Sequence, residues 1–320
     1  MTLSIRQLPC AKTQLMDPKQ YPAGNVFFNP SADGDIVYIR ATRHTSHDET
    51  NYALIHNTRT QKTHPVESPL DQLAPTVNMF KGLEDLRVVH FRGQLWFTAT
   101  TTHASGHQNN EMVVGHFSKD LARIERISPI SAGKLPVKNI CPFVWPSADA
   151  APEDQRLRLI DTYKRAIYEV SELYEDATGA EDAEAAPTPF LRYLLTRVGT
   201  LRSATGIPDI GYRGSTSPVH LHGNTWGCVV HDIIFNDNAR LVTRLAYYHH
   251  WMEMDLARGV VTYFSAPFWI AHWGIEYVSG IRRAPTPSAG TDAAIELFFG
   301  LQDQVPMKCV ARLSDLRVGK

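Results

Sequence analysis

Two neighbouring acids and a base lie at the start of a predicted strand. Glu84, Asp85 and Arg87 lie within residues 82–87, directly before the alternating run 88–91. A carboxyl group in such a place can donate or accept a proton during group transfer, and a guanidinium can hold a carboxylate or phosphate. Burying two acids at a strand start without partners is costly. We therefore expect Glu84 and Asp85 on a rim that faces solvent or a ligand.

The same layout of a polar entry followed by strands recurs along the chain. Asn29, Asp85, Asn139, Ser217 and Glu276 mark its copies, at intervals of 56, 54, 78 and 59 residues. Each copy contains short β-branched and aromatic runs separated by turn residues, as in the hairpin around Gly93. Five units of about 55–60 residues are typical of a radial array of small antiparallel sheets. The spacing thus predicts an all-β, five-bladed β-propeller, formed by residues 1–320 as one domain; a two-domain β-sandwich is the alternative.

The long interval between two markers indicates an insertion near residues 171–212. It begins with an acidic, alanine-rich tract at residues 172–186 and continues with the apolar run 190–195. The tract is typical of a solvated loop or helix, and the apolar run of a short helix. We expect this insertion to be partly helical or disordered.

The innermost strand of each propeller blade begins near the central channel, so the polar entries should converge there although they are far apart in sequence. A convergence of polar groups in a concave mouth describes a ligand site. The residues expected to meet are Asn29, Glu84, Asp85, Arg87, Lys138, Asn139, Arg213, Ser215, Thr216 and Glu276.

The composition excludes several classes of function. The net charge of −1 argues against a broad nucleic-acid surface, and no apolar run reaches the ~18 residues of a membrane span. Residues 1–16 do not have the pattern of a signal peptide, and the four cysteines form no CxxC, as expected of a reduced cytoplasmic protein. We also expect no metal and no cofactor, because no ligand cluster or glycine-rich phosphate loop is evident.

Several short motifs resemble the five-bladed propellers of the β-mannoside phosphorylases and related mannosyltransferases. They are Gly82-Leu83-Glu84-Asp85-Leu86-Arg87, Lys138-Asn139-Ile140-Cys141-Pro142-Phe143, Asn29-Pro30-Ser31 and Arg213-Gly214-Ser215-Thr216. The likeness extends from about Phe28 to Arg317. Leu86 occupies the position after the acidic pair, where the family typically has proline. Ile140 occupies the position after the Lys-Asn pair, where the family often has tryptophan.

The resemblance implies a single catalytic acid, matching Asp85, that delivers a proton towards the glycosidic oxygen of a carbohydrate substrate. It further implies that phosphate, or the phosphate of a sugar-phosphate donor, occupies the opposite face and that the anomeric centre is inverted. A phosphate group needs cationic and hydroxyl donors around it. The candidate phosphate-binding residues are Arg87, Lys138, Arg213, Ser215, Thr216, His231 and His249. The candidate substrate-binding residues are Asn29, Arg40, Glu84, Arg87, Lys138, Asn139, Tyr163 and Asp303.

Tryptophans offer flat surfaces for the apolar faces of sugars. Trp96 and Trp226 lie inside predicted strands and are expected in the core, whereas Trp269 and Trp273 lie in a loop-like segment that can form a sugar platform.

Three hypotheses of function follow. The first is glycosyl transfer, with mannosyl as the expected unit, by phosphorolysis or from an activated donor. The second is an inverting glycoside hydrolase, which needs a second carboxylate to activate water, and Asp303 and Glu276 are the candidates. The third is a propeller that binds a glycan or a protein without catalysis, which the departures at Leu86 and Ile140 leave open.

Overall fold

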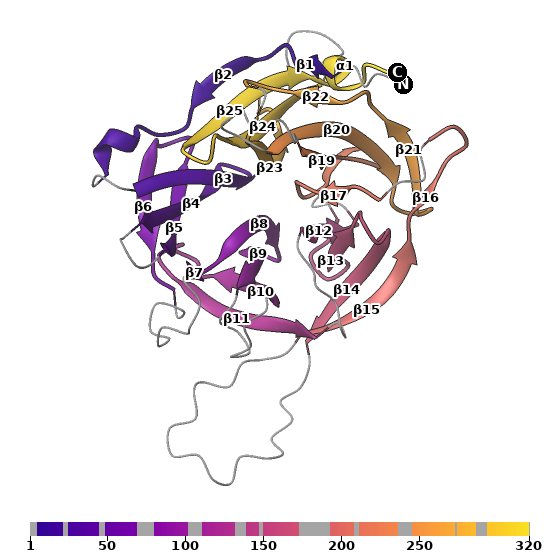
Figure 1. Ribbon diagram of the computed structural model, residues 1–320. Coiled ribbons are helices and arrows are strands. Elements are labelled where there is room, and N and C mark those ends of the chain that lie inside the picture. Colours follow the sequence, from indigo (N-terminus) through magenta and orange to yellow (C-terminus); the bar gives the residue numbers. More distant parts are fainter. Residues whose placement is uncertain are drawn as a thin grey trace.

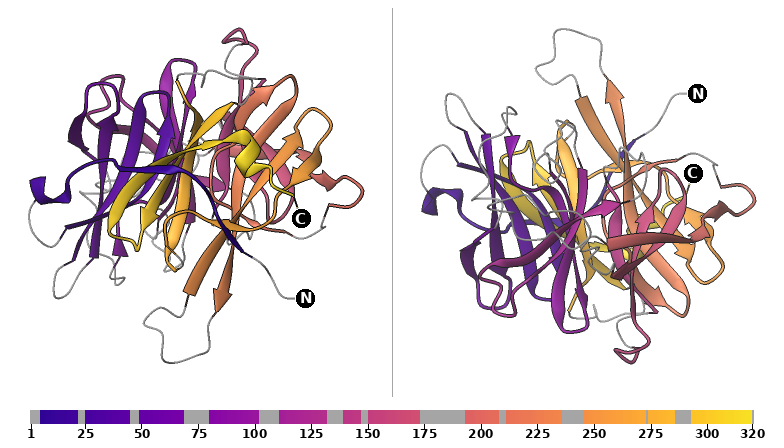
Figure 2. Two further views of the ribbon diagram at one scale, coloured as in Figure 1. Left: turned by 90° about the horizontal axis from the view of Figure 1, so that it is seen from above. Right: turned by 90° about the horizontal axis from the view of Figure 1, so that it is seen from below.

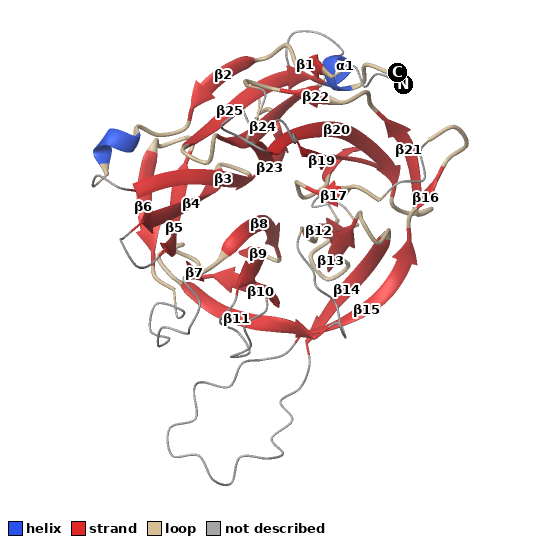
Figure 3. Ribbon diagram, viewed as in Figure 1, coloured by secondary structure: helices blue, strands red, loops and turns tan. Residues whose placement is uncertain are grey.

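The computed structural model describes residues 5–21, 25–44, 49–68, 80–101, 111–131, 139–146, 150–172, 193–207, 211–235, 245–272, 274–285 and 293–319. Strands are the dominant secondary structure of these residues, and turns and loops connect them (Figure 3). The helices among them are a 3-10 turn, η1 (Pro18–Gln20), and one short α-helix, α1 (Leu313–Leu316). The strands surround a central axis in a propeller arrangement, which confirms the predicted all-β propeller class (Figure 1).

Hydrogen bonds group the strands into four sheets. The first contains β3 (Asn25–Asp33), β4 (Ile36–His44), β5 (Glu49–Asn57), β6 (Lys62–Val66) and β7 (Phe80–Lys81). The second contains β8 (Glu84–Phe91), β9 (Gln94–Thr101), β10 (Glu111–Phe117), β11 (Ile124–Ser131), β12 (Cys141–Trp145), β13 (Arg156–Asp161), β14 (Ala166–Glu172) and β15 (Tyr193–Thr200).

The other two sheets bring the chain ends together. The third contains β1 (Arg6–Gln7), β16 (Arg202–Ser203), β17 (Arg213–Gly214), β18 (Val219–His222), β19 (Thr225–Phe235), β20 (Leu245–Asp255), β21 (Val260–Phe264) and β22 (Phe268–Trp269). The fourth contains β2 (Ala11–Gln14), β23 (Glu276–Arg283), β24 (Ala294–Leu301) and β25 (Val305–Arg312). Because β2 pairs with β25, the N-terminal segment closes the ring beside the C-terminal strands (Figure 2).

The four sheets correct the expectation of five blades. The second sheet has eight strands because its outer strands β11 and β15 pair in parallel, at Ile130↔Tyr193 and Ser131↔Leu194. The two four-stranded antiparallel runs that the sequence pattern separates are thereby one hydrogen-bonded sheet. A pairing between strands more than 60 positions apart has no signature in the local pattern.

The predicted insertion also differs from the expectation that it is partly helical or disordered. The described part of residues 171–212 is extended rather than helical: Tyr193–Thr200 forms β15 and Arg202–Ser203 forms β16. The described part of the apolar run, residues 193–195, therefore belongs to an outer strand that pairs with β14. The acidic tract at residues 172–186 lies outside the described residues, apart from Glu172.

The core lies between the faces of neighbouring sheets. Trp251 and Phe268 of the third sheet pack with Phe299 of the fourth, and Phe27 of the first packs with Phe298 of the fourth. All five side chains are fully buried. Burial of such faces on both sides of each sheet stabilises the ring and leaves polar residues for the axis.

Candidate active site at the start of the inner strands

Three of the marker residues have an unusual backbone conformation at corresponding places. Asn29 of β3, Asp85 of β8 and Asn139, just before β12, have φ values of 49°, 50° and 68°. Residues other than glycine rarely adopt this left-handed conformation, and the register of β3 and of β8 shifts at these positions. Such bulges redirect side chains and are common beside active sites. Here they turn three polar side chains towards one cavity.

This cavity has a volume of about 270 Å³ and is assembled from all four sheets. The residues that line it are Phe28, Asn29, Arg40, Asp85, Asn139, Arg213, His231, Tyr247, Tyr277 and Asp303. Most of them occupy the inner strands or the turns next to them. The cavity is thus a property of the closed ring rather than of any one sheet.

The carboxylate of Asp85 is held from one side. The Asn29 side chain donates from Nδ2 to Asp85 Oδ1 over 2.9 Å, and Arg40 Nη1 lies 3.8 Å from the same oxygen. Arg40 is itself fixed by Asn51, which accepts from its Nε over 2.8 Å, and its Nη2 lies 3.5 Å from Glu84 Oε1. Within the described part of the chain these contacts all use Oδ1 of Asp85, which leaves Oδ2 for a proton or a ligand.

A buried cation lies beneath the cavity. The side chain of Arg87 is 1% exposed, donates from Nη2 to the Tyr277 hydroxyl over 2.5 Å and from Nε to the Ser215 carbonyl. Burial acts to lower the pKa of Arg87, but Tyr277, Cys141 and Asp85 together outweigh it and raise that pKa. Arg87 therefore stays charged and supplies a fixed positive charge to the floor of the cavity.

His231 lies at the wall as a neutral ring. Its Nδ1 is 2.7 Å from the Ser215 hydroxyl, and its side chain is nearly fully buried. Burial, followed by His249, Arg87 and Arg213, lowers the pKa of His231 well below its usual value. A neutral imidazole can donate or accept a hydrogen bond but adds no charge.

Aromatic rings form one wall of the cavity. Tyr277 lies 5.0 Å from the His231 ring and 5.7 Å from the Tyr247 ring, centroid to centroid. The Tyr277 hydroxyl donates to Asn139 Oδ1 over 3.0 Å. Burial raises the pKa of Tyr277, and burial together with Asp303 and Asp85 raises that of Tyr247. Both phenols therefore stay protonated, and they offer apolar faces with polar rims.

The structure brings half of the predicted site residues together. Those that line the cavity are Asn29, Arg40, Asp85, Asn139, Arg213, His231 and Asp303. Glu84 lies behind Arg40, and Arg87 and Ser215 lie beneath the cavity through Tyr277 and His231. Lys138 lies outside the described residues.

Three predicted ligand-binding residues are placed elsewhere. Thr216 is buried, and its hydroxyl accepts from the Val229 amide, a contact that fixes the backbone. His249 is fully buried, and its Nε2 accepts from the Val278 amide over 3.3 Å. Tyr163 is 63% exposed in the turn between β13 and β14. None of the three lines the cavity. His249 shares a face of β20 with Tyr247 but lies two positions further along the strand, where it packs against Phe268.

Glu276 also has a structural position. It is fully buried, and its carboxylate accepts from the backbone amides of Ile270, Ala271 and His272 over 2.5, 2.5 and 3.1 Å. These bonds anchor the segment after β22 and exclude Glu276 as a water-activating base. Of the two candidates for a second carboxylate, Asp303 alone lines the cavity, from the turn between β24 and β25.

Sequence reasoning missed Phe28, Tyr247 and Tyr277. Tyr277 directly follows a marker, and Tyr247 lies two positions before His249 on β20, so strand alternation was a usable signal for Tyr247. The expected platform of Trp269 and Trp273 is not part of this site: Trp269 belongs to β22 and does not line the cavity, and Trp273 lies outside the described residues. Trp96 and Trp226 are buried, as predicted.

The described residues contain no candidate metal site and no candidate membrane-spanning helix. No three histidine, cysteine, aspartate or glutamate side chains in this part of the chain gather as a metal site. In the same residues, the longest apolar helix falls short of the length required to cross a membrane.

Comparisons with known proteins show the fold. No family model matches the sequence, and no curated protein matches it. Solved structures do match: a glycosyl hydrolase from Bacteroides ovatus (10% identity, 92% of this chain and 87% of that chain, TM-score 0.52) and a protein from Bacteroides thetaiotaomicron VPI-5482 provisionally described as a glycosidase (13%, 90% and 87%, 0.54). A β-1,2-mannobiose phosphorylase from Listeria innocua overlays less well (11%, 92% of both chains, 0.46).

Proposed function

We propose that this chain is a carbohydrate-active enzyme that transfers a glycosyl unit with inversion, using phosphate or a sugar-phosphate donor. One observation carries the proposal. Of the three left-handed residues at the starts of the inner strands, Asp85 alone has a carboxyl group, whereas Asn29 and Asn139 carry amides that cannot exchange a proton. Asp303 is also left-handed and lines the cavity, but it lies in the turn between β24 and β25. The glycosidases among the structural neighbours support a carbohydrate as the substrate.

A single carboxyl group at the inner strand starts suits a reaction whose nucleophile comes from outside the protein. An inverting hydrolase needs one carboxyl group to protonate the leaving oxygen and another to activate water. In phosphorolysis, Asp85 gives its proton to the glycosidic oxygen as the bond from that oxygen to the anomeric carbon breaks. A phosphate oxygen attacks the same carbon from the opposite face, and the products are a sugar 1-phosphate and the released acceptor.

The cationic side of the cavity supports an anionic reactant. Arg213 is exposed at the mouth, and Arg87 contributes its buried charge from below. Neutral His231 and the phenols of Tyr247 and Tyr277 add hydrogen-bonding groups without negative charge. An arginine fork is well suited to phosphate. We assign Arg213 to the phosphate, and the wall of Tyr247 and Tyr277 to the apolar face of a sugar, with a mannosyl unit as the first to test.

The second candidate function is inverting hydrolysis, favoured by Asp303. Its carboxylate lines the same cavity as Asp85, and it is the second carboxylate that such a reaction requires.

The buried free cysteines Cys141, Cys228 and Cys309 fit a reducing compartment, so we propose that the enzyme is cytoplasmic.

The test measures consumption of mannosyl 1-phosphate with simple sugar acceptors, and of β-mannosides with and without phosphate. We expect turnover that depends on phosphate, a loss of at least about a thousandfold in Asp85→Asn, and a smaller loss in Asp303→Asn. Arg213→Ala should raise the KM for phosphate more than it lowers kcat.

Other outcomes separate the alternatives. Turnover of glycosides without phosphate, abolished equally by Asp85→Asn and Asp303→Asn, would establish the hydrolase. If no donor is consumed and glycan binding is the same in wild type and Asp85→Asn, the catalytic proposal is wrong and the propeller is a binding protein.

A further inference from the structure

A second and larger pocket lies at the other end of the inner strands. It has a volume of about 430 Å³, within the range of small-molecule sites. Strand β8 runs from Asp85 at the first cavity to His90 at this pocket, a rise of roughly 16 Å at about 3.3 Å per residue. Strand β23 connects the two ends in the same way, from Tyr277 to Arg282.

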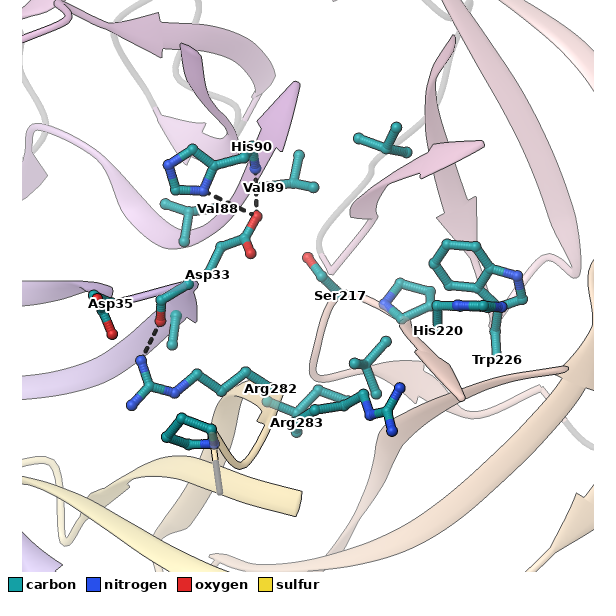
Figure 4. Close-up of a pocket in the computed structure, with 17 residues that line it drawn as sticks. Asp33, Asp35, Val88, Val89, His90, Ser217, His220, Trp226, Arg282 and Arg283 are labelled. Carbon is teal, nitrogen blue, oxygen red and sulfur yellow. Dashed lines mark hydrogen bonds and ion pairs between the residues drawn. The ribbon is translucent and has the colours of Figure 1, made fainter. Parts of the chain in front are cut away.

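Polar groups converge on this pocket from separate sheets (Figure 4). On one side Asp33 accepts from the His90 backbone amide through Oδ2, which also lies 3.4 Å from His90 Nδ1. On another side the Arg283 side chain extends along the pocket, and no ion pair of its guanidinium falls among the described residues (Figure 4).

Ser217 is the most informative of these groups. Its side chain is part of the pocket lining, and its hydroxyl oxygen is buried with no hydrogen-bond partner among the described residues (Figure 4). A buried hydroxyl without a partner costs free energy that a hydrogen-bonding ligand would recover. Ser217 is also one of the five sequence markers, and the proposed reaction does not use it.

The balance of charges selects the class of ligand. Most charges of the lining are paired: Arg282 with Glu296, Asp33 with His90 and Asp35 with Arg59. A neutral ligand with hydroxyl groups can donate to Asp33 and accept from Arg283 without disturbing these pairs. The walls between the polar groups are mainly apolar, formed by Val88, Val89, Val144 and Val219 together with Trp226. Apolar walls with mixed donors and acceptors match the C–H faces and hydroxyl edges of a sugar.

We propose that this pocket is a non-catalytic binding site for a neutral saccharide of one or two rings, held by Asp33, Ser217 and Arg283. The site is separate from the cavity around Asp85, and its chemistry is argued from its own lining. It therefore stands whether or not the proposed reaction is correct.

The test is calorimetric titration of the full chain, carrying Asp85→Asn and Arg213→Ala to weaken the first cavity, with cellobiose and with mannobiose. We expect saturable binding of at least one disaccharide, weakened about three- to tenfold by Ser217→Ala and by Arg283→Ala. Ser128 provides a matched control, because its hydroxyl is likewise unpartnered among the described residues but lines neither pocket. Ser128→Ala should leave the affinity unchanged.

Folding and binding can be told apart. Because the Ser217 hydroxyl makes no hydrogen bond to the described residues, Ser217→Ala should not lower the melting temperature of the free protein, while it lowers the affinity for the sugar. Binding that Ser217→Ala and Arg283→Ala leave unchanged, or no binding of either disaccharide, would overturn the proposal. Titration with inorganic phosphate covers the anionic alternative, and binding of phosphate without the disaccharides would also overturn it.

Discussion

Asn29 donates a hydrogen bond of 2.9 Å to Asp85, and both residues occupy the left-handed region of backbone conformation at corresponding strand bulges. They are 56 positions apart, in adjacent sheets. The hydrogen bond places a neutral donor beside Asp85. Asp85 is the only ionisable residue of the three left-handed residues at the starts of the inner strands. It orients Asp85 without adding a second negative charge.

Replacing Asn29 should change the reaction through Asp85. Asn29→Ala removes the donor that orients the carboxyl group, so we expect kcat to fall about 10- to 100-fold with a smaller change in KM. Asn29→Asp replaces the donor by a carboxylate that repels Asp85, so kcat should fall at least as far as in Asn29→Ala. An unchanged kcat in both variants would show that Asn29 does not orient Asp85.

The Tyr277 hydroxyl should contribute substantially to stability. It accepts from Arg87 and donates to Asn139, so Tyr277→Phe leaves two buried polar groups short of a partner. We expect the free energy of unfolding to fall by about 1–3 kcal/mol in chemical denaturation. Tyr247→Phe is the matched control in the same wall and should cost less than about 1 kcal/mol. An equal loss of unfolding free energy in the two variants would contradict the assignment of two buried hydrogen bonds to the Tyr277 hydroxyl.

Glu276 should be a structural residue rather than a catalytic one. Its carboxylate accepts three backbone hydrogen bonds, and an amide would turn donors towards some of those N–H groups. We expect Glu276→Gln to lower the free energy of unfolding by about 2–3 kcal/mol, measured by denaturation. The exposed Glu125, in a surface ion pair with Arg123, is the control, and Glu125→Gln should cost at most about 1 kcal/mol. Full stability with lost turnover in Glu276→Gln would reverse this assignment.

Two buried histidines should make the fold sensitive to acid. Burial, then the neighbouring His250, lowers the pKa of His249 to about 3, and burial also lowers that of His231. As the pH falls below about 6.5, the unfolded chain takes up protons at these positions before the folded chain does. The free energy of unfolding should therefore fall by about 1.4 kcal/mol per pH unit for each histidine, until the folded-state pKa is reached.

Denaturation of wild type and His249→Gln between pH 7 and pH 4 tests this expectation. Glutamine can still accept from the Val278 amide, so the variant should fold while its stability depends less steeply on pH. His222→Gln, at an exposed position, is the control and should leave the slope unchanged. A wild-type slope equal to that of His249→Gln would contradict the assignment of buried neutral histidine.

Local patterns were enough to predict most of the strands. The alternating run 88–91 lies within β8, and Trp96 and Trp226, expected inside strands, belong to β9 and β19. Alternation and turn residues indicate strands locally, because successive side chains of a strand point to opposite faces of the sheet. The same local signal failed for residues 190–195: their described part, 193–195, belongs to outer strand β15, because pairing with β14 overrides their preference.

The sequence by itself determined that the chain is all-β, that it repeats, and that polar residues such as Asn29, Asp85 and Asn139 begin its inner strands. Those features depend on spacing and residue type, which are local. Only the tertiary structure decided that the described strands form four sheets, that Tyr277 joins Asp85 in one cavity, and that His249 does not. These relationships join residues from different sheets. They exist only once the ring has closed and the bulges have set the direction of each side chain.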